Sequence, residues 1–358
     1  MTILHPYEDP RRRCLKVQEW PERDRRAWMK ALEPGDILDG TAGPGFHWSE
    51  QTREKYRKGY GRWLTFLTVT GRFEPDVSPA DRITAENVRA YIEELRETVS
   101  SWTLWGRLSE LLAAAKVLAP DRDWGWLRQV VRHFEGRVQS SKDKLLRLRS
   151  AAEIANWAFG RMVALTSGDT DRRTPVHYRD ALMVALLIHC PTMRLANLAM
   201  IRIGKHLCQL SEGYQLLFAP EETKTRKPFA IPVPASLVPY IDCYLRDHRP
   251  TLLGSNDTDR LWINYAGRPL SQKGAYDRIV TVTEQAFGVP INPHLFRDCA
   301  VTSVALENPE HIGIAAPILG HTDPRTTEEH YIQANAIVAG RKLRRSVDIL
   351  KEQFPPPI

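Results

Sequence analysis

Residues 292–331 read NPHLFRDCAVTSVALENPEHIGIAAPILGHTDPRTTEEHY, and the rest of the chain is best interpreted from this stretch. Asn292 is a good helix N-cap and Pro293 suits a first helical turn, so the sequence predicts a helix from here to about Glu307. Five residues recur at helical spacing and predict its core face: Phe296, Cys299, Ala300, Ser303 and Val304.

Four polar side chains of this stretch are candidates for chemistry. His294 and Arg297 are three residues apart and are expected to lie together off the core face. An imidazole beside a guanidinium fork suits the binding of a phosphate. Leu319–His321 reads as a helix end and a turn that presents a second imidazole, and Tyr331 is a phenol in a polar segment, where its hydroxyl is expected to be used.

Composition sets limits on the class of protein. A length of 358 residues predicts about two domains, and 42% hydrophobic residues are enough for hydrophobic cores. The net charge of +7 favours a polyanionic partner, with an ordinary basic protein as the alternative. Five scattered cysteines without a CxxC pair indicate reduced thiols, and neither a disulfide framework nor a zinc site. No signal peptide or run of 18 apolar residues is evident, so a cytoplasmic protein is expected, neither secreted nor membrane-spanning.

The N-terminal part of the chain is predicted to be helical after a charged extension. Residues 1–47 are rich in charge, Pro and Gly and are interpreted as an extension that orders on a partner, and residues 48–140 as a bundle of four short helices. Tyr56, Tyr60 and Trp63 recur at helical spacing, which favours a core stripe over a base-stacking platform. The basic residues around this stripe, which form either a phosphate-binding set or a solvated face, are Arg53, Arg57, Lys58 and Arg62.

The C-terminal part is predicted to be mainly helical with a small β-sheet. After a linker at 138–146, helices are expected at 151–165, 178–188, 235–246 and 271–286. Arg194 follows the end of the second of these helices. Residues 213–234 alternate as strands do and predict a hairpin, with Lys224 and Lys227 near its tip.

Six residues together resemble the catalytic signature of the tyrosine recombinase, or phage integrase, family. In chain order they are Arg194, Lys224, His294, Arg297, His321 and Tyr331. The resemblance implies an α+β catalytic domain at 147–336 and a tail helix at 337–358. It also implies that residues 48–140 are the family's SAM-like helical core-binding domain, which binds DNA together with the catalytic domain.

The chemistry of phosphodiester cleavage gives each residue of this set a role. Tyr331 would attack phosphorus to form a 3′-phosphotyrosine link, and Arg194 and Arg297 would hold the non-bridging oxygens. His294 and His321 are the candidates for general acid and base. In the family a lysine is thought to protonate the leaving 5′-oxygen. The resemblance implies this role for Lys224, with Lys227 on the same hairpin as its rival, and implies no cofactor, metal or ATP.

Several alternatives stay open for the histidines. His294 could be a satisfied core or capping histidine, and His321 could do no more than hydrogen-bond its turn. A metal site formed by His294, His321 and His330 fits no zinc spacing, and two nearby arginines would oppose a divalent cation.

The sequence departs from the family pattern at three places. Asn197 stands three residues after Arg194, where the family usually has an acidic residue. The interval from His321 to Tyr331 is one residue longer than the commonest spacing, with His330 beside the tyrosine. The residues before Arg194 read CPTM, where a glycine turn is more usual.

The expected function is therefore a site-specific recombinase or integrase of a mobile genetic element. Its expected partners are double-stranded DNA at a recombination site, three further protomers in a tetrameric synapse and accessory DNA-bending proteins, with a nucleoid-associated location. A monomeric type IB-like topoisomerase and a catalytically impaired DNA-binding protein are the alternatives. A C-terminal stripe is expected to dock on a neighbouring protomer or on its own domain: Leu343, Val347, Leu350 and Phe354.

Overall fold

A computed structural model describes residues 9–36, 40–137, 146–167 and 171–307, with side chains to residue 304. The chain divides into two compact units, Met1–Ser141 and Lys142–Ile358, and each has its own hydrophobic core. We call them the N-terminal unit and the C-terminal unit. No helix in the described ranges is both long and apolar enough to cross a membrane, and all five cysteines are free thiols.

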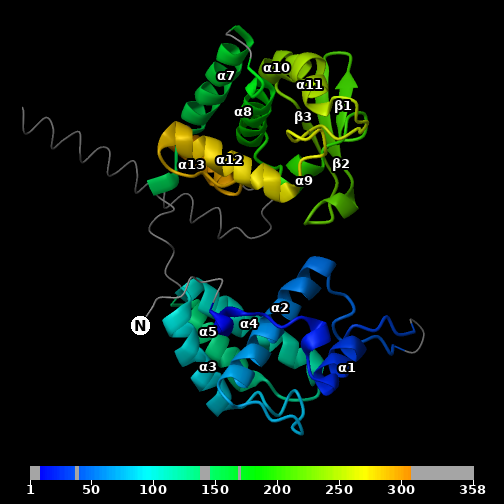
Figure 1. Ribbon diagram of the computed structural model, residues 1–358, viewed down its shortest axis with the longest axis vertical. Coiled ribbons are helices and arrows are strands. Elements are labelled where there is room, and N and C mark those ends of the chain that lie inside the picture. The colour runs from blue at the N-terminus through cyan, green and yellow to red at the C-terminus, as the bar shows by residue number, and fades with distance from the viewer. Residues whose placement is uncertain (1–8, 37–39, 138–145, 168–170, 308–358) are drawn as a thin grey trace, which may run out of the picture. The chain divides into compact units, whose positions relative to one another are not determined.

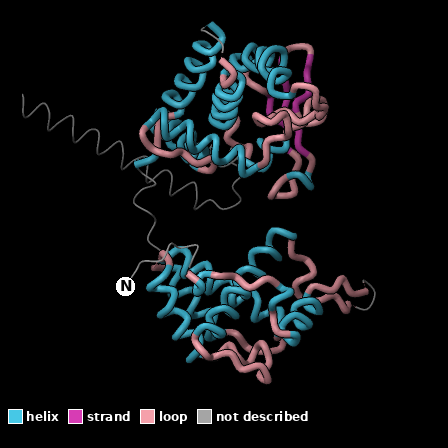
Figure 2. Tube along the Cα trace, in the orientation of Figure 1, coloured by secondary structure: helices cyan, strands magenta, loops and turns pink. Residues whose placement is uncertain are grey.

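The N-terminal unit is helical (Figures 1 and 2). Two short 3-10 turns, Pro10–Arg12 and Val17–Glu19, precede α1 (Glu22–Ala31), α2 (Glu50–Val69), α3 (Ala85–Thr98), α4 (Ser101–Leu118) and α5 (Gly125–Glu135). Hydroxyl caps begin three of these helices, because Ser49, Thr84 and Ser100 each accept a hydrogen bond from the backbone N–H three residues on. Tyr60 and Trp63 of α2 are fully buried, so the aromatic stripe is core, as the sequence indicates.

Residues 9–36 differ from the predicted extension, because they are part of this core. Trp20 and Trp28 are buried in it. Asp24 of α1 accepts hydrogen bonds from the buried guanidinium of Arg82, with Nη2 to Oδ2 at 2.7 Å, and from the Tyr60 hydroxyl at 2.6 Å. A buried carboxylate with these partners fixes α1 to the bundle without any second molecule.

The C-terminal unit is built around α8 (Thr174–His189), whose residues 178–188 are all buried. It packs against α7 (Ala151–Ser167), α12 (Gln272–Phe287) and α13 (Leu295–Glu307). The remaining helical segments are α9 (Leu195–Met200), the short turns Pro220–Glu222 and Ala235–Leu237, α10 (Val238–Cys243), a π-helical turn Tyr244–His248, and α11 (Arg249–Leu253). Mainly helical structure with a small sheet confirms the predicted fold class.

The sheet of this unit is antiparallel, in the order β1-β2-β3. The predicted hairpin is formed by β2 (Gly213–Phe218) and β3 (Phe229–Pro232), paired from Gln215–Pro232 to Phe218–Phe229. The strand β1 (Leu207–Leu210), which the sequence analysis did not predict, pairs with β2 through a tight turn. Gly213 has φ +92° at that turn, a value that favours glycine. Lys224 and Lys227 lie in the loop between β2 and β3.

Candidate active site and comparison with known proteins

The helix α13 begins as the sequence predicts. The Asn292 side-chain oxygen accepts hydrogen bonds from the backbone N–H groups of His294 and Leu295, both at 3.1 Å. Arg297 lies on the first turn and is 3% exposed, whereas His294 is exposed. Arg297 is therefore not off the core face, and this part of the sequence interpretation is corrected.

Arg297 is buried because it holds the turn that ends α8. Its Nη1 donates to the carbonyl oxygens of Pro191 at 2.9 Å and Thr192 at 3.0 Å. These residues belong to the CPTM sequence that stands in place of a glycine turn. A guanidinium nitrogen thus satisfies two carbonyls just before Arg194, and the two predicted arginines are brought to the same region of the C-terminal unit.

The pKa values of both arginines are lowered. Burial, and then the charge of Arg194, lower the pKa of Arg297 to about 10, and burial lowers the pKa of the partly buried Arg194. At neutral pH Arg297 is still cationic. Two cations held together in a partly dehydrated site repel each other, and a bound anion such as a phosphate relieves that repulsion.

Asn197 connects the Arg194 turn with the hairpin loop. Arg194 is the N-cap residue of α9, and its backbone N–H lies 3.4 Å from the side-chain oxygen of Asn197. The Asn197 amide nitrogen donates to the carbonyl oxygen of Glu222 at 3.0 Å. Asn197 is buried, 2% exposed, and both of these hydrogen bonds are partly shielded from solvent.

Hydrogen bonds of Thr223 to backbone carbonyls stabilise the hairpin loop that carries the candidate lysines. Thr223 is buried, and its hydroxyl lies 3.0 Å from the Pro220 carbonyl and 2.9 Å from the Lys227 carbonyl. Lys224 and Lys227 are both exposed on this loop. Both lysines therefore have the solvent exposure that a proton donor to bound DNA needs.

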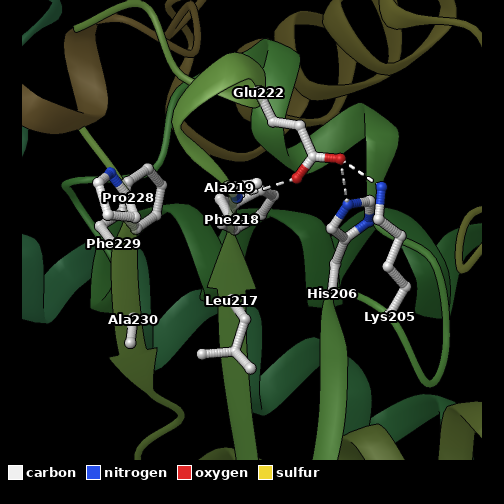
Figure 3. Close-up of a pocket in the computed structure, with 9 residues that line it drawn as sticks. All are labelled: Lys205, His206, Leu217, Phe218, Ala219, Glu222, Pro228, Phe229 and Ala230. Atoms are coloured by element: carbon white, nitrogen blue, oxygen red, sulfur yellow. Dashed lines mark hydrogen bonds and ion pairs between the residues drawn. The ribbon is translucent and has the colours of Figure 1, made fainter. Parts of the chain in front are cut away.

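A polar cluster at the base of the loop, in which only His206 is fully buried, was missed by the sequence analysis (Figure 3). The Glu222 carboxylate contacts the Lys205 ammonium, His206 Nε2 at 3.1 Å and the Ala219 backbone N–H at 3.0 Å. The Lys205 hydrogen bond, followed by the Ala219 and His206 bonds, lowers the pKa of Glu222 to about 2 against the cost of burial. Glu222 and His206 are 16 residues apart, and no short motif relates them.

The last two residues of the predicted catalytic set, His321 and Tyr331, lie outside the described residues. His330 and the predicted tail helix also lie outside them. The described part of the set consists of Arg194, Arg297 and His294, and of the Lys224 loop that Asn197 joins to Arg194.

The candidate DNA-binding residues of α2 differ in their surroundings. Arg62 is 3% exposed and its Nη2 donates to Glu94 at 2.7 Å, so its proposed role in phosphate binding is corrected to that of a buried ion-pair partner. Arg57 and Lys58 both contact Glu54 at the surface. Arg53 donates to the Phe46 carbonyl at 2.7 Å and is partly buried.

Comparison with curated proteins gives relatives that are named as tyrosine recombinases, while no family model matches the chain. A tyrosine recombinase XerD from Staphylococcus haemolyticus is 30% identical over 152 residues, 42% of this chain and 49% of that protein. The XerD proteins of Chlorobaculum tepidum and Halalkalibacterium halodurans are 24% and 25% identical, over 86% and 76% of this chain and 93% and 84% of theirs. These relatives are all named as tyrosine recombinases, the family that the sequence resembles.

Solved structures agree with this assignment at the level of the fold. A XerH site-specific recombinase bound to palindromic difH substrate, in a post-cleavage complex, has a TM-score of 0.57 and is 15% identical, covering 96% of this chain and 98% of that one. The pre-cleavage complex with difH has a TM-score of 0.53 at 15% identity, covering 86% and 91%. The similarities to XerD proteins support the predicted family, and those to the XerH structures confirm the predicted fold. The match to the Staphylococcus haemolyticus protein spans about half of that relative's length.

Proposed function

We propose that this chain is a tyrosine recombinase, which cleaves and rejoins double-stranded DNA at a specific site through a 3′-phosphotyrosine intermediate. The observation that carries the proposal is the pair Arg194 and Arg297, held together by the Pro191–Thr192 turn. These residues have the chemistry needed to hold the two non-bridging oxygens of a phosphodiester.

The proposed reaction is a transesterification. The Tyr331 phenolic oxygen attacks phosphorus, a bond between phosphorus and the tyrosine oxygen forms, and the bond to the 5′-oxygen breaks. A phenol has a reference pKa of about 10, so its proton passes to a neighbouring base, His294 or His321. Lys224 gives a proton to the departing 5′-oxygen. The reaction involves no oxidation or reduction. Because one phosphoester replaces another, a second 5′-hydroxyl can reverse the step.

The arginines contribute by electrostatics. Negative charge builds on the phosphoryl oxygens as the tyrosine attacks, and cations already in place stabilise that charge without reorganising. Arg297 is held at the carbonyls of Pro191 and Thr192, so its position is set before DNA binds. Removing one such cation typically lowers the rate by about 10²–10³-fold.

Further parts of the proposal concern partners and context. The chain would act in the cytoplasm on duplex DNA associated with the nucleoid, as a tetramer on two synapsed sites with accessory DNA-bending proteins, for a mobile genetic element. Lys58 and Arg57 of α2 and Lys227 of the hairpin loop are proposed to contact the DNA backbone, because they are at the surface of their units. The curated relatives are named as recombinases, which favours this function over that of a topoisomerase.

Incubation with nicked suicide duplexes tests the function. The duplexes are tiled across the DNA that flanks the gene, and denaturing electrophoresis detects protein that stays attached to DNA. A covalent adduct that forms in EDTA is expected. Arg194→Ala and Arg297→Ala should reduce it by about 10²-fold or more while DNA binding is retained. DNA binding without any adduct, on every duplex of the panel, would contradict the proposal.

A further inference from the structure

We propose that Asn197 and Glu222 act together as positioning residues for Lys224, setting the base of its loop against the Arg194 turn. This inference rests on the proposed function of Lys224 as proton donor. It gives the asparagine, which stands where the family usually has an acidic residue, a role that a carboxylate could not fill.

The Asn197 amide forms hydrogen bonds with two backbone groups. Its oxygen accepts from the Arg194 backbone N–H at 3.4 Å, and its nitrogen donates to the Glu222 carbonyl at 3.0 Å. An amide both donates and accepts, whereas an ionised carboxylate can only accept. In Asn197→Asp, an anionic oxygen would therefore face the Glu222 carbonyl oxygen inside a buried site, and the two would repel.

The Glu222 side chain is held by His206, Lys205 and the Ala219 backbone. His206 is 1% exposed, and its Nδ1 accepts from the Arg202 backbone N–H at 3.0 Å. Its Nε2 therefore carries the proton and donates to Glu222. Figure 3 shows the carboxylate directed at His206, Lys205 and the Ala219 backbone at once. The Glu222 side chain is thus held by residues next to the ends of β1 and β2, and its carbonyl is held by Asn197 of α9.

Lys224 lies two residues after Glu222. Thr223 between them is buried, with its hydroxyl closing the loop onto the Pro220 and Lys227 carbonyls. The Lys224 side chain itself is exposed. The Lys224 ammonium is therefore solvated, while the backbone that carries it is connected at Glu222, through Asn197, to Arg194. Arg194 is the arginine proposed to hold the same phosphate. Loss of that fixation would misplace the proton donor and leave the arginines able to bind DNA.

A substrate with a 5′-bridging sulfur tests the inference. A thiol has a reference pKa of about 8.5, so a departing 5′-thiolate needs no proton, and cleavage of this substrate does not depend on Lys224. Asn197→Asp should cleave the all-oxygen substrate about 10- to 100-fold more slowly than the unaltered protein, with the same DNA affinity. Lys224→Ala should lose about 10²–10⁴-fold. Both variants should recover most of the lost rate on the sulfur substrate.

The matched control is Asn256→Asp. Asn256 also donates its amide to a backbone carbonyl, that of Leu253 at 3.0 Å, in a surface turn after α11. This variant should cleave both substrates at the unaltered rate. A normal rate for Asn197→Asp on the all-oxygen substrate would overturn the inference. A defect that is equally large on the sulfur substrate would also overturn it, because Lys224 would then not be the group affected.

A measurement without DNA separates this inference from the proposed function. Backbone amide exchange of peptides covering residues 219–228 should be faster in Asn197→Asp than in the unaltered protein, and unchanged in Asn256→Asp. Equal exchange in the three proteins would contradict the positioning role even if the enzyme were active. Absence of a covalent adduct with the unaltered protein, alongside faster exchange in Asn197→Asp, would instead contradict the proposed function and leave the Asn197–Glu222 link supported.

Discussion

Arg297 of α13 is connected through its Nη1 atom to the turn that follows α8. The Nη1 group serves the carbonyls of Pro191 and Thr192, and the residue is buried by that contact. A residue proposed to bind phosphate is therefore also a structural residue. Its replacement is expected to affect stability and catalysis together.

Arg297→Ala should lower the free energy of unfolding of the C-terminal unit by about 1–3 kcal/mol, because the carbonyls of Pro191 and Thr192 lose the hydrogen bonds from this guanidinium. Urea denaturation measured by circular dichroism gives this quantity. Arg246→Ala is the control, since Arg246 pairs with its neighbour Asp247 at the surface with 72% of its side chain exposed. The control should change stability by less than about 0.5 kcal/mol. An equal effect of the two substitutions would show that the contact of Arg297 with Pro191 and Thr192 does not contribute to the free energy of unfolding.

The helix α1 shows how a short segment is made part of a domain. Its Asp24 is fully buried and serves Arg82 and Tyr60 of the bundle. The segment before it crosses α2 at Gly61, where Leu15 donates its backbone N–H to the Gly61 carbonyl. A Cβ added at Gly61 would lie 2.2 Å from the Leu15 carbonyl oxygen, so this close approach requires glycine.

Asp24→Ala should destabilise the N-terminal unit by about 3–5 kcal/mol, because it leaves the Arg82 charge buried without its partner. Tryptophan fluorescence during urea denaturation reports mainly on this unit, since eight of the ten tryptophans precede residue 142. Asp81→Ala removes a surface partner of Arg122, with side chains 63% and 40% exposed, and should cost less than about 1 kcal/mol. If both variants unfolded at the same urea concentration, the assigned role of Asp24 would be refuted.

Glu222, in the loop between β2 and β3, is a titratable residue whose contacts stabilise that loop. Its pKa is lowered from an ordinary 4.5 to about 2, chiefly by the Lys205 hydrogen bond. A lowered pKa means that the folded state favours the carboxylate, so this contribution to stability is complete above pH 4.5 and is lost as pH falls toward 2. Glu222→Gln removes the titrating group. The stability difference between the unaltered protein and Glu222→Gln should therefore shrink from pH 5 to pH 2, as measured by thermal unfolding, and a constant difference would contradict this account.

Sequence alone could predict the local features of both units but not the long-range contacts of their buried arginines. Asn292 as a cap, the aromatic stripe of α2 and the β2–β3 hairpin follow from local chemistry and spacing, and the structure has them. Arg297 and Arg62 were misplaced because their partners, the Pro191–Thr192 turn and Glu94, are distant in sequence. Helical spacing shows which residues share a face, but it does not show what another segment places there.

The same reason explains the other differences. The charged residues of 9–36 suggested an extension, while Asp24 of that segment is paired through Arg82, which is 58 residues away. Asn197 lacks the charge of the acidic residue that is usual in the family, but its side-chain oxygen and nitrogen both form hydrogen bonds with backbone groups. Long-range partners of buried polar groups leave no local signal, so the structure was needed to find them.

For the whole molecule, the excess of basic residues predicts that DNA affinity depends on salt. The logarithm of the binding constant should fall linearly with the logarithm of salt concentration, by about 0.9 for each phosphate contacted. Lys227→Ala should reduce this slope by about 1 if that exposed lysine contacts a phosphate, as proposed. Lys273→Ala, on α12 and paired with Asp277, is the comparison and should leave the slope unchanged. Equal slopes for Lys227→Ala and the unaltered protein would remove Lys227 from the interface.

The account depends most directly on which side chain becomes joined to DNA. The measurement is mass spectrometry of the peptide that stays attached to the suicide duplex after proteolysis, with Tyr331→Phe run in parallel. We predict a phosphodiester link on Tyr331 and no adduct from Tyr331→Phe. A link on another residue, or an adduct that persists in Tyr331→Phe, would contradict the proposed mechanism.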